Sequence, residues 1–446
     1  MAEQSGLAPT PVRGYIDGCW DIMHSGHFNA IRQAKSICDV LIVGVHSDLE
    51  IEENKALPVL QQDERYALLE HVKWIDEILH DVPYSPQLET LDRARADFCI
   101  HGDDMPVNSQ GVCAYDEMKH AGRLRLIRRT EGVSTTDIIG KLITLSRHQH
   151  ATGHAWQDLA VSDAAVKLDA NVAIKHYHDT SASTLQTSSA IEEHPSIAAA
   201  MQRVLEVAST YNMKADDVEK LKAAFGLAEQ NSLTQPVCRT NPQDDTSVRV
   251  RTPVQMLAST RRITQFASGR QPTSDDKVVY VCGSFDMFHV GHAQFLKDAR
   301  EHGSFLLVGI YEDLEVSRVK GCSLPVMSVN ERVLNVCACK WVDEVIIGAP
   351  RNVTEELLKS WNVAVVARGI EHRKAAVISA SADDGYARPK QLEKYVEIPS
   401  KWPNLCHETI VERIVGSREV YINRNKVRAR REEDYYANKK TRVAEE

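Results

Sequence analysis

The feature that most constrains the fold of this 446-residue chain is a long internal repeat. The stretch YIDGCWDIMHSGH, residues 15–27, returns as YVCGSFDMFHVGH, residues 280–292, at an offset of 265 positions. The register continues beyond the two histidine motifs, and a two-residue insertion later moves the offset to 267. Pairs matched at these offsets are Gly44 with Gly309, Asp48 with Asp313, Lys55 with Lys320, Arg65 with Arg332, Trp74 with Trp341 and Gly102 with Gly369. The chain therefore holds a duplicated domain rather than a short solenoid repeat.

Length and composition predict a globular protein with two domains. The chain is longer than one core usually supports, with 43% hydrophobic and 26% charged residues. It has no apolar run near the roughly 18 residues of a membrane span, and its start lacks a secretory signal pattern. Ten cysteines without CxxC pairs argue against a zinc site and favour free thiols in the cytoplasm. A net charge of -9 argues against nucleic acid as the main partner, because that partner needs a concentrated basic face.

Each copy begins with the pattern of a βαβ unit. An apolar, β-rich run (13–16 and 278–281) precedes the histidine motif, and a helical pattern (28–36 and 293–301) follows it. The next runs, DVLIVGV and FLLVGI, are continuously apolar, like strands buried on both faces of a parallel sheet. Later apolar runs, ADFCIHG and NVAVVARG, extend the alternation of strands and helices. We therefore predict an α/β fold of two tandem Rossmann-like domains, 12–145 and 275–416, each a doubly wound parallel sheet that binds ligands at the carboxyl ends of its strands.

The segment between the copies, 146–274, is predicted to be a partly helical linker. Stretches such as TSASTLQTSSA and TNPQDDTS are rich in small polar residues and supply little core. Two runs near 195–228 have helical apolar spacing, so we expect a helical hairpin there. A spacer is favoured over a regulatory role for this hairpin. The tail, 417–446, mixes both signs of charge and is expected to be a solvated helix or a disordered end.

The HxGH motif of the first copy is a candidate phosphate site. A metal site is disfavoured, because the two histidines are only three positions apart and no third ligand follows at a familiar spacing. Where a strand leads into a helix, backbone N–H groups and the helix dipole attract an anion, and Gly26 lets the anion approach the main chain. His24 and His27 lie on one side of the first helical turn, so both could direct hydrogen bonds at the same phosphate.

These motifs resemble those of the cytidylyltransferases in the HxGH nucleotidylyltransferase superfamily. The segment RTEGVSTTDII, residues 129–139, is similar to the second signature of that family, and two tandem domains are the hallmark of its phosphoethanolamine branch. The resemblance covers about 12–145 and 277–416. It implies transfer of CMP from CTP to phosphoethanolamine, with release of pyrophosphate, for phosphatidylethanolamine synthesis. It also implies Mg²⁺ with the CTP, and catalysis by positioning and electrostatic stabilisation without a protein nucleophile.

The resemblance further implies roles for individual residues of the first copy. The residues that match the catalytic groups, which stabilise the phosphates and the leaving group, are His24, His27, Lys55 and Arg129. The nucleotide-binding set adds Gly18, Cys19, Trp20, Gly26, His101, Gly102, Asp103, Thr130, Gly132, Val133, Ser134, Thr135 and Thr136. The candidates for the amino-alcohol pocket are Asp17, Trp74, Asp104 and Tyr115. For Trp74, core packing is an equal alternative.

The second copy departs from the family pattern where the chemistry is most demanding. Asp17 is replaced by Cys282 and His101 by Arg368, and GVSTTDII is matched by NLCHETIV, with no RTxG before it. We therefore expect catalysis in the first copy, and a second copy that binds nucleotide weakly or only supports the first across a pseudo-twofold contact. The residues retained for a secondary nucleotide site are Ser284, Phe285, His289, Gly291, His292, Lys320, Arg368 and Gly369.

The alternatives are a phosphocholine cytidylyltransferase, another HxGH nucleotidylyltransferase such as an adenylyltransferase, and a noncatalytic nucleotide-binding scaffold. The duplication disfavours the first two, and the linker lacks the lysine-rich amphipathic helix expected of a choline-specific relative. An intact first copy disfavours the scaffold. Beyond its small-molecule substrates, we expect a contact between the two lobes of the chain and a cytoplasmic location, at most peripheral at the endoplasmic reticulum. The sequence leaves open whether the chain forms a homodimer. Selectivity between ethanolamine and choline depends on a few pocket contacts that the sequence does not place.

Overall fold

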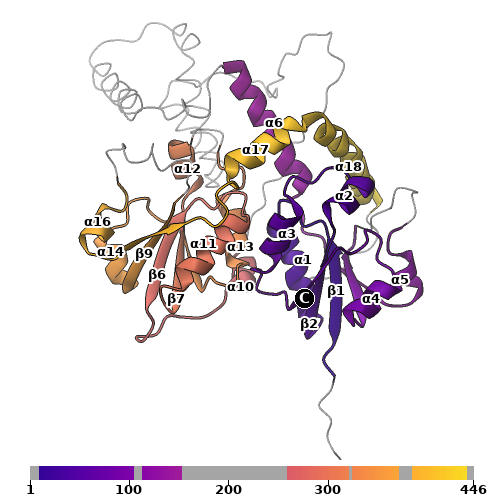
Figure 1. Ribbon diagram of the computed structural model, residues 1–446, viewed down its shortest axis with the longest axis horizontal. Helices are drawn as coiled ribbons and strands as arrows, with labels where there is room; N and C mark the ends of the chain where they lie inside the picture. The colour runs from indigo at the N-terminus through magenta and orange to yellow at the C-terminus, as the bar shows by residue number, and fades with distance from the viewer. Residues whose placement is uncertain (1–9, 105–112, 153–258, 321–323, 371–383, 439–446) are drawn as a thin grey trace, which may run out of the picture. The chain divides into compact units, whose positions relative to one another are not determined.

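The computed structural model describes residues 10–104, 113–152, 259–320, 324–370 and 384–438, which contain two five-stranded parallel sheets (Figure 1). The strand order is β3-β2-β1-β4-β5 in the first sheet and β10-β9-β6-β7-β8 in the second. The predicted fold class, two tandem Rossmann-like domains, is therefore confirmed. The hairpin predicted near 195–228 lies outside the described residues.

The first lobe places its candidate site at the point where the strand order reverses. Its strands are β1 (Arg13–Gly18), β2 (Val40–Val45), β3 (Glu77–His80), β4 (Phe98–Gly102) and β5 (Leu124–Ile127). Its helices are α1 (Ser25–Ser36), α2 (Asp48–Asn54), α3 (Gln62–Leu69), α4 (Leu88–Ala94), α5 (Asp116–His120) and α6 (Thr135–Thr152). Strand β1 lies between β2 and β4. The HxGH loop follows its carboxyl end, at the topological switch point where doubly wound sheets bind ligands.

The second lobe repeats this plan. Its strands are β6 (Val278–Gly283), β7 (Phe305–Ile310), β8 (Glu344–Ile347), β9 (Val363–Ile370) and β10 (Tyr395–Pro399). Its helices are α11 (Val290–Arg300), α12 (Asp313–Lys320), α13 (Val329–Cys337), α14 (Glu355–Ser360), α16 (Ala387–Gln391) and α17 (His407–Gly416). Strand β6 lies between β7 and β9, as β1 lies between β2 and β4. The duplication seen in the sequence is thus a duplication of the whole topology.

The helical segments at the ends of the lobes differ from the predicted domain limits. Helix α6 runs to Thr152, beyond the predicted end of the first domain, and α10 (Thr260–Phe266) lies within the predicted linker. Its last residue, Phe266, is fully buried. The tail contains α18 (Arg418–Asn438), which is the helical one of the two alternatives expected for it. In the described part of the chain, no helix has the length and apolar character needed to cross a membrane.

Successive residues of the central strands face two different apolar layers. Tyr15 packs in a cluster with residues of α4 and α5, such as Leu91 and Met118. Ile16, its neighbour, packs on the opposite face in the cluster that contains Phe28 of α1. Side chains alternate between the faces of a strand, so a sheet covered by helices on both faces needs apolar residues at every position. This requirement explains the continuous apolar runs of the sequence.

The two lobes meet through an apolar cluster and through a backbone contact between equivalent residues. The cluster on the α1 face continues into the second lobe, where the Phe28 and Phe288 rings meet edge-on with centroids 6.5 Å apart. Val72 and Cys339, which are equivalent in the repeat, form an isolated antiparallel bridge. The flanking hydrogen bonds are reciprocal: Lys73 N–H to the Ala338 carbonyl, 3.1 Å, and Lys340 N–H to the His71 carbonyl, 2.9 Å. Reciprocal pairing is the mark of a twofold contact, so the predicted pseudo-twofold contact between lobes is confirmed.

Candidate active site

The first histidine of the HxGH motif caps helix α1. His24 has extended backbone dihedral angles (φ -135°, ψ 174°), and its Nδ1 accepts a hydrogen bond from the Gly26 N–H at 3.1 Å. A ring nitrogen that accepts carries no proton, so neutral His24 holds its proton on Nε2. Nε2 lies 3.5 Å from the Thr135 hydroxyl oxygen at the start of α6. His24 therefore presents a donor between the amino ends of two helices, where an anion is favoured.

His27 and Gly26 complete this turn. The His24 and His27 rings are 4.1 Å apart between centroids, and the edge of Trp20 meets His27 at 5.8 Å. A Cβ on Gly26 would lie 2.9 Å from Cε1 of His24 and 3.1 Å from a methyl carbon of Val133. Only glycine fits under the His24 ring, because Cβ atoms do not approach other heavy atoms this closely. The structure thus brings together five residues that the sequence analysis singled out.

The loop between β1 and α1 holds two residues in a costly conformation. Trp20 (φ 52°) and Ile22 (φ 43°) lie in the left-handed region, which bulky and β-branched residues rarely adopt. Their equivalents in the second lobe, Phe285 and Met287, do the same. Such residues cost about 1 to 3 kcal/mol each and persist only where surrounding contacts enforce them. For Trp20 one such contact is the hydrogen bond from its indole N–H to the Gly44 carbonyl, 2.8 Å.

Two charged residues that were not predicted as site residues hold this loop in place. The Asp21 carboxylate accepts the backbone N–H groups of Val59 and Leu60, at 3.0 and 2.9 Å. Arg65 is fully buried and donates to the Cys19 carbonyl at 2.7 Å. It also donates to the carbonyls of His46 and Leu60 and pairs with Asp48. The signal available in the sequence was the repeat, which matches Asp21 with Asp286 and Arg65 with Arg332.

Lys55, predicted to be catalytic, lies at the end of α2 beside this loop. It is exposed, and its Nζ is 3.5 Å from the Cys19 sulfur. Its equivalent, Lys320, stands 3.1 Å from the hydroxyl of Ser284. Each lobe thus places one lysine ammonium next to the loop that leads into the HxGH turn, where it can neutralise phosphate charge.

The second signature folds over the HxGH turn from the other side. Ser134 caps α6: its hydroxyl oxygen accepts the Asp137 N–H at 3.1 Å and donates to the Asp137 carboxylate at 2.8 Å. The Arg129 guanidinium forms an ion pair with Asp104 at 3.2 Å, and the Arg129 backbone N–H donates to the Asp103 carboxylate at 3.0 Å. Asp103 and Asp104 follow β4, directly after His101 and Gly102. The loop after β4 therefore orients the guanidinium of the signature arginine.

Helix α1 supplies two further contacts that the sequence analysis missed. The buried Asn29 amide donates to the Thr130 hydroxyl at 3.0 Å, and the Gln33 amide donates to the Arg128 carbonyl at 3.0 Å. Both side chains are buried in α1. Buried polar groups require partners. They therefore fix the RTEG segment, in which Gly132 (φ 81°) makes a left-handed turn, against the helix that carries His27.

A buried acidic cluster lies at the carboxyl ends of β1 and β4, next to the loop that leads into the HxGH turn. The Asp17 carboxylate accepts the hydroxyls of Tyr115 at 2.5 Å and Tyr15 at 3.3 Å. The His101 ring stacks at a tilt on Tyr115, with centroids 4.4 Å apart. Burial raises the pKa of Asp17 to about 7, and the two hydroxyl hydrogen bonds oppose that shift. Burial also lowers the pKa of His101. The cluster thus places a carboxyl group with a raised pKa beside an imidazole with a lowered pKa.

Trp74, in contrast, is not brought to the site. It precedes β3, at the amino end of that strand, and its ring meets Phe266 of α10 edge-on with centroids 5.1 Å apart. The Lys73 ammonium lies 5.0 Å from the same ring. The site occupies the opposite, carboxyl end of the sheet. We therefore assign Trp74 to packing near the contact between the lobes and withdraw it from the amino-alcohol pocket.

The second lobe keeps the HxGH geometry. His289 accepts the Gly291 N–H at 3.1 Å, and its ring lies 4.0 Å from that of His292. The residue equivalent to Thr135, however, is His407. Burial first, and then the positive charge of His407, lower the pKa of His289 to about 3. An imidazole in place of a hydroxyl changes the donors that a triphosphate would meet, as the depleted signature predicted.

Among the described residues of the second lobe, a thiol and a guanidinium stand at the positions equivalent to the acidic cluster. Cys282 stands where Asp17 stands, with its sulfur 3.2 Å from the Tyr311 hydroxyl and 3.5 Å from the Tyr386 hydroxyl. Arg368, which precedes Gly369 in β9, places its guanidinium 5.1 Å from the Tyr386 ring centroid. Burial raises the pKa of the Cys282 thiol, so the thiol stays neutral. A neutral thiol beside a guanidinium does not attract an ammonium group.

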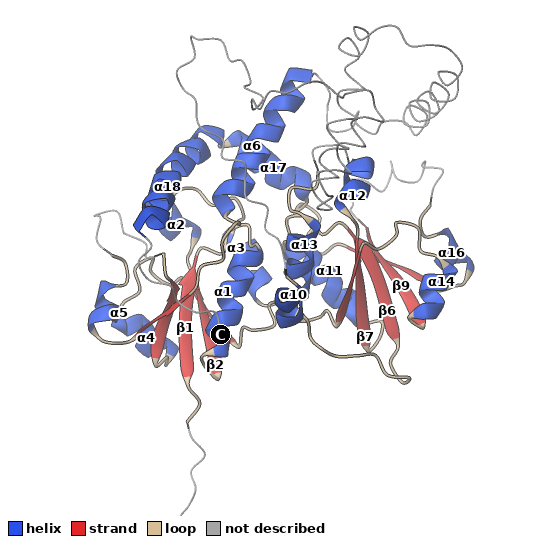
Figure 2. Cartoon of the chain, turned by 180° about the vertical axis from the view of Figure 1, so that it is seen from behind, coloured by secondary structure: helices blue, strands red, loops and turns tan. Residues whose placement is uncertain are grey.

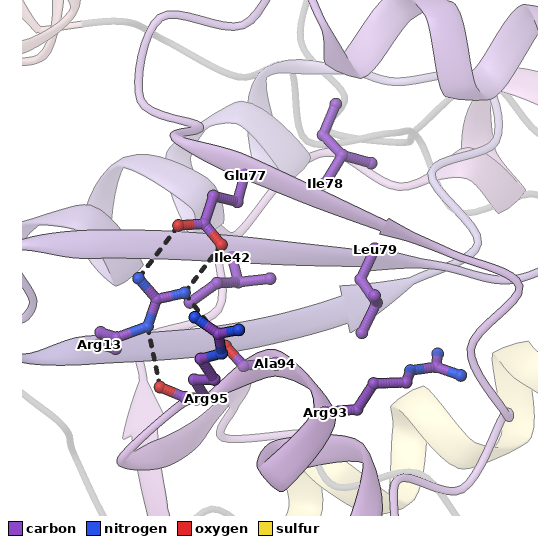
Figure 3. Close-up of a pocket in the computed structure, with 8 residues that line it drawn as sticks. All are labelled: Arg13, Ile42, Glu77, Ile78, Leu79, Arg93, Ala94 and Arg95. Carbon is purple, nitrogen blue, oxygen red and sulfur yellow. Dashed lines mark hydrogen bonds and ion pairs between the residues drawn. The ribbon is translucent and has the colours of Figure 1, made fainter.

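A cavity of about 350 Å³ lies at the other end of the first sheet (Figure 3). Its lining includes Arg13 and Glu77, the first residues of β1 and β3. Figure 3 shows the Arg13 guanidinium forked onto the Glu77 carboxylate, at 3.0 and 2.8 Å, and bonded to the Arg95 carbonyl. These groups satisfy one another, and the cavity is remote from the HxGH turn. We therefore do not include it in the site.

Two doubly wound sheets, each with an HxGH turn at its switch point, define the class of nucleotidylyltransferases. A cytidylyltransferase-like family model matches residues 15–141 and 280–386, one stretch in each lobe. The chain is 34% identical to ethanolamine-phosphate cytidylyltransferase of Dictyostelium discoideum, over 95% of this chain and 96% of that protein. It is also 34% identical to the Mus musculus enzyme of that name, over 94% of this chain and 90% of the enzyme. The chain belongs to the ethanolamine-phosphate cytidylyltransferase family.

A choline-phosphate relative matches a smaller part of the chain. Choline-phosphate cytidylyltransferase A of Homo sapiens is 38% identical, but over 36% of this chain and 46% of its own length. The full-length matches to the ethanolamine-phosphate enzymes include both lobes, whereas this match is shorter than the two lobes together. The duplication is therefore shared with the ethanolamine-phosphate family.

The fit of Gly26 under the His24 ring generates a prediction. Gly26→Ala should lower kcat/KM for CTP by about 100-fold, because the methyl group displaces the ring whose Nε2 faces α6. Gly140→Ala in α6 is the matched control, since a Cβ there meets nothing within 4 Å. It should leave kcat/KM within about twofold and stabilise the helix slightly. Pyrophosphate release and thermal unfolding measure both variants; equal activity of the two would contradict the assignment.

Proposed function

We propose that this chain transfers CMP from CTP to phosphoethanolamine and forms CDP-ethanolamine and pyrophosphate, as the family name of its relatives indicates. The observation that carries this function is the first-lobe site itself. There the HxGH turn, Lys55 and the RTEG signature surround one end of the sheet, and the buried Asp17 carboxylate lies beside them. Phosphate-binding groups and an ammonium-binding group are thus available in one site, which is what the two substrates require.

The reaction needs no group of the protein to form a covalent bond. A phosphate oxygen of phosphoethanolamine attacks the α-phosphorus of CTP, and the bond from that phosphorus to the bridging oxygen of pyrophosphate breaks. Negative charge accumulates on the α-phosphate oxygens and on the leaving pyrophosphate. We assign the Nε2–H of His24, His27, Lys55 and Arg129 to stabilise that charge. The His24 donor is fixed before substrate binds, by its hydrogen bond to the Gly26 N–H, so little reorganisation is needed.

We propose that Mg²⁺ arrives with the CTP. Two carboxylates near the HxGH turn already have partners in the chain: Asp21 accepts two backbone N–H groups, and Asp104 pairs with the Arg129 guanidinium. Within the described residues, no group of three or more His, Cys, Asp and Glu side chains could hold a metal ion. Triphosphate oxygens and water are ligands that Mg²⁺ accepts readily. When bound there, the ion would neutralise part of the triphosphate charge.

Asp17 is the residue that we assign to the ammonium group of phosphoethanolamine. The ammonium has three N–H donors, and the Asp17 carboxylate, supported by the Tyr115 and Tyr15 hydroxyls, is an acceptor of opposite charge. Choline carries three methyl groups in place of those donors and cannot hydrogen-bond to the carboxylate. A site built to bond an N–H group discriminates against an analogue that lacks it. The pocket therefore favours ethanolamine over choline.

We also retain as proposals a cytoplasmic location, at most peripheral association with the endoplasmic reticulum, and a homodimer. The cysteines of the described residues, such as Cys19, Cys38 and Cys282, are free thiols. Free thiols are typical of reducing compartments, which supports the cytoplasmic location. Weak nucleotide binding by the second lobe is a further proposal, supported by its retained HxGH turn and Lys320.

The direct test of this function compares head groups. Purified protein with CTP and Mg²⁺ should release pyrophosphate with phosphoethanolamine, and kcat/KM with phosphocholine should be at least about 100-fold lower. CDP-ethanolamine should appear in equal amount to the pyrophosphate. Equal turnover of both amino alcohols would contradict the Asp17 assignment, and pyrophosphate release that needs neither would contradict the proposed reaction.

The raised pKa of Asp17 generates a separate prediction. Since that pKa is about 7 in the free protein, the carboxyl group becomes neutral as the pH falls below this value and loses its attraction for the ammonium. KM for phosphoethanolamine should therefore rise as the pH falls from about 8 to 6, in addition to the effect of titrating the substrates themselves. Asp17→Asn should have a high KM that lacks this extra step. Parallel pH profiles of KM for the wild type and Asp17→Asn would refute the assignment.

A further inference from the structure

The segment 55–61 of the first lobe is a part of the site that three sets of contacts hold in position. It joins α2 to α3 and begins at Lys55, whose Nζ lies 3.5 Å from the Cys19 sulfur. The first set of contacts comes from Asp21, which accepts the N–H groups of Val59 and Leu60. The second comes from Arg65, which joins the Leu60 carbonyl to the Cys19 carbonyl. The segment and the HxGH loop are therefore fixed to one another.

The third set comes from the second lobe. Arg413 of α17 donates to both carboxylate oxygens of Glu64, at 2.6 and 2.9 Å, and to the Val59 carbonyl at 3.2 Å. The Glu64 side chain is only 6% exposed. It also accepts the Gln61 N–H at 2.9 Å, which closes the first turn of α3. Bidentate pairs between arginine and carboxylate are strong and directional. Arg413 therefore anchors the carboxyl end of the segment that begins at Lys55.

This contact is much stronger than its counterpart across the pseudo-twofold axis. In the repeat, Arg413 corresponds to Lys141 of α6, because GVSTTDIIGK is matched by NLCHETIVER. Lys141 reaches across to the equivalent carbonyl, that of Val326, but with one contact at 3.5 Å. Glu331, the equivalent of Glu64, bonds within its own lobe to the N–H and hydroxyl of Ser328. The bidentate pair between Arg413 and the buried Glu64 carboxylate therefore stabilises the first lobe. This is the lobe that retains the complete second signature.

The tail helix α18 also contacts the first lobe, close to the contact made by α17. Figure 2 shows α17 and α18 beside α6, and residues of both helices contact α6. The Asn425 amide of α18 donates to the Thr136 carbonyl at 3.2 Å, in the first turn of α6. Tyr421, in the first turn of α18, is 1% exposed. The carboxyl-terminal helices thus contact both the second signature, residues 129–139, and the segment 55–61.

We propose that Arg413 is a positioning residue for the reaction of the first lobe: through Glu64 and the Val59 carbonyl it holds the segment that presents Lys55 to the triphosphate. This inference rests on the proposed function for its kinetic consequence, but its structural part does not. It gives the second lobe a role that does not require turnover there. The lobe that has lost triphosphate donors supplies a guanidinium that orders the site of the other.

The test uses the full chain with Arg413→Met, and Lys141→Met as the matched control. Hydrogen exchange at the Val59 and Leu60 amides should become faster in Arg413→Met, because the contact that anchors their segment is lost. The equivalent amides, Val326 and Met327, bond to Asp286 in the same way and serve as an internal reference. Their exchange should not change. Faster exchange at all four amides would indicate general destabilisation and would overturn the proposal.

Kinetics separate positioning from mere structural support. Arg413→Met should lower kcat/KM for CTP by between about 10-fold and 100-fold, whereas Lys141→Met should stay near wild type. In a Lys55→Met background, Arg413→Met should cause little further loss, since both changes remove the same contribution. Full additivity of the two losses would overturn the proposal. If Arg413→Met does not fold, Arg413→Lys, which keeps the charge but not the fork, should give an intermediate loss.

Failure of the proposed function is recognised separately. Wild-type protein that does not turn over phosphoethanolamine would contradict the function. The comparison of hydrogen exchange at the two pairs of amides would still show whether Arg413 holds the segment 55–61 in place. Unchanged exchange at Val59 and Leu60 in a protein that is active on phosphoethanolamine would overturn the positioning role and leave the function intact.

Discussion

The Gly26 N–H donates to Nδ1 of His24, and much of the site follows from that hydrogen bond. It caps α1 with an imidazole, fixes the proton of neutral His24 on Nε2, and directs that donor toward the start of α6. The bond requires glycine at position 26, because any Cβ there would collide with the ring. It also requires the strained loop before it, which Asp21 and Arg65 stabilise. A phosphate donor is therefore in place before the substrate arrives.

Duplication explains why two similar lobes can have different roles. Both HxGH turns have nearly the same ring geometry, with centroids 4.1 and 4.0 Å apart, so the strand-turn-helix unit remains stable without its partner signature. The acidic cluster is different, because Cys282 stands in the second lobe where Asp17 stands in the first. The reciprocal backbone contacts at Val72 and Cys339 keep the lobes paired. If the reaction occurs in the first lobe, as we propose, the second lobe still contributes packing and Arg413 to its neighbour.

Much of the fold could be predicted from the sequence, because buried parallel strands appear as continuous apolar runs and the repeat gives each run twice. The histidine turn could be placed for the same reason. Contacts between distant segments could not be predicted in this way. Arg65 donates to backbone carbonyl groups, which every residue carries, and Arg413 pairs with Glu64 of the other lobe. Neither contact therefore produces a local sequence pattern. Trp74 was ambiguous because packing and ligand binding both favour aromatic residues. Its neighbour, Phe266, lies in a segment predicted to be linker.

The central claim, that chemistry occurs at the HxGH turn of the first lobe, is tested most directly by two double variants. Pyrophosphate release with CTP, Mg²⁺ and phosphoethanolamine would be measured for His24→Ala/His27→Ala and for His289→Ala/His292→Ala. We expect the first variant to lose turnover, and the second to keep turnover with at most a modest change in KM for CTP. Turnover that survives the first change and disappears with the second would place the reaction in the second lobe and refute the assignment to the first.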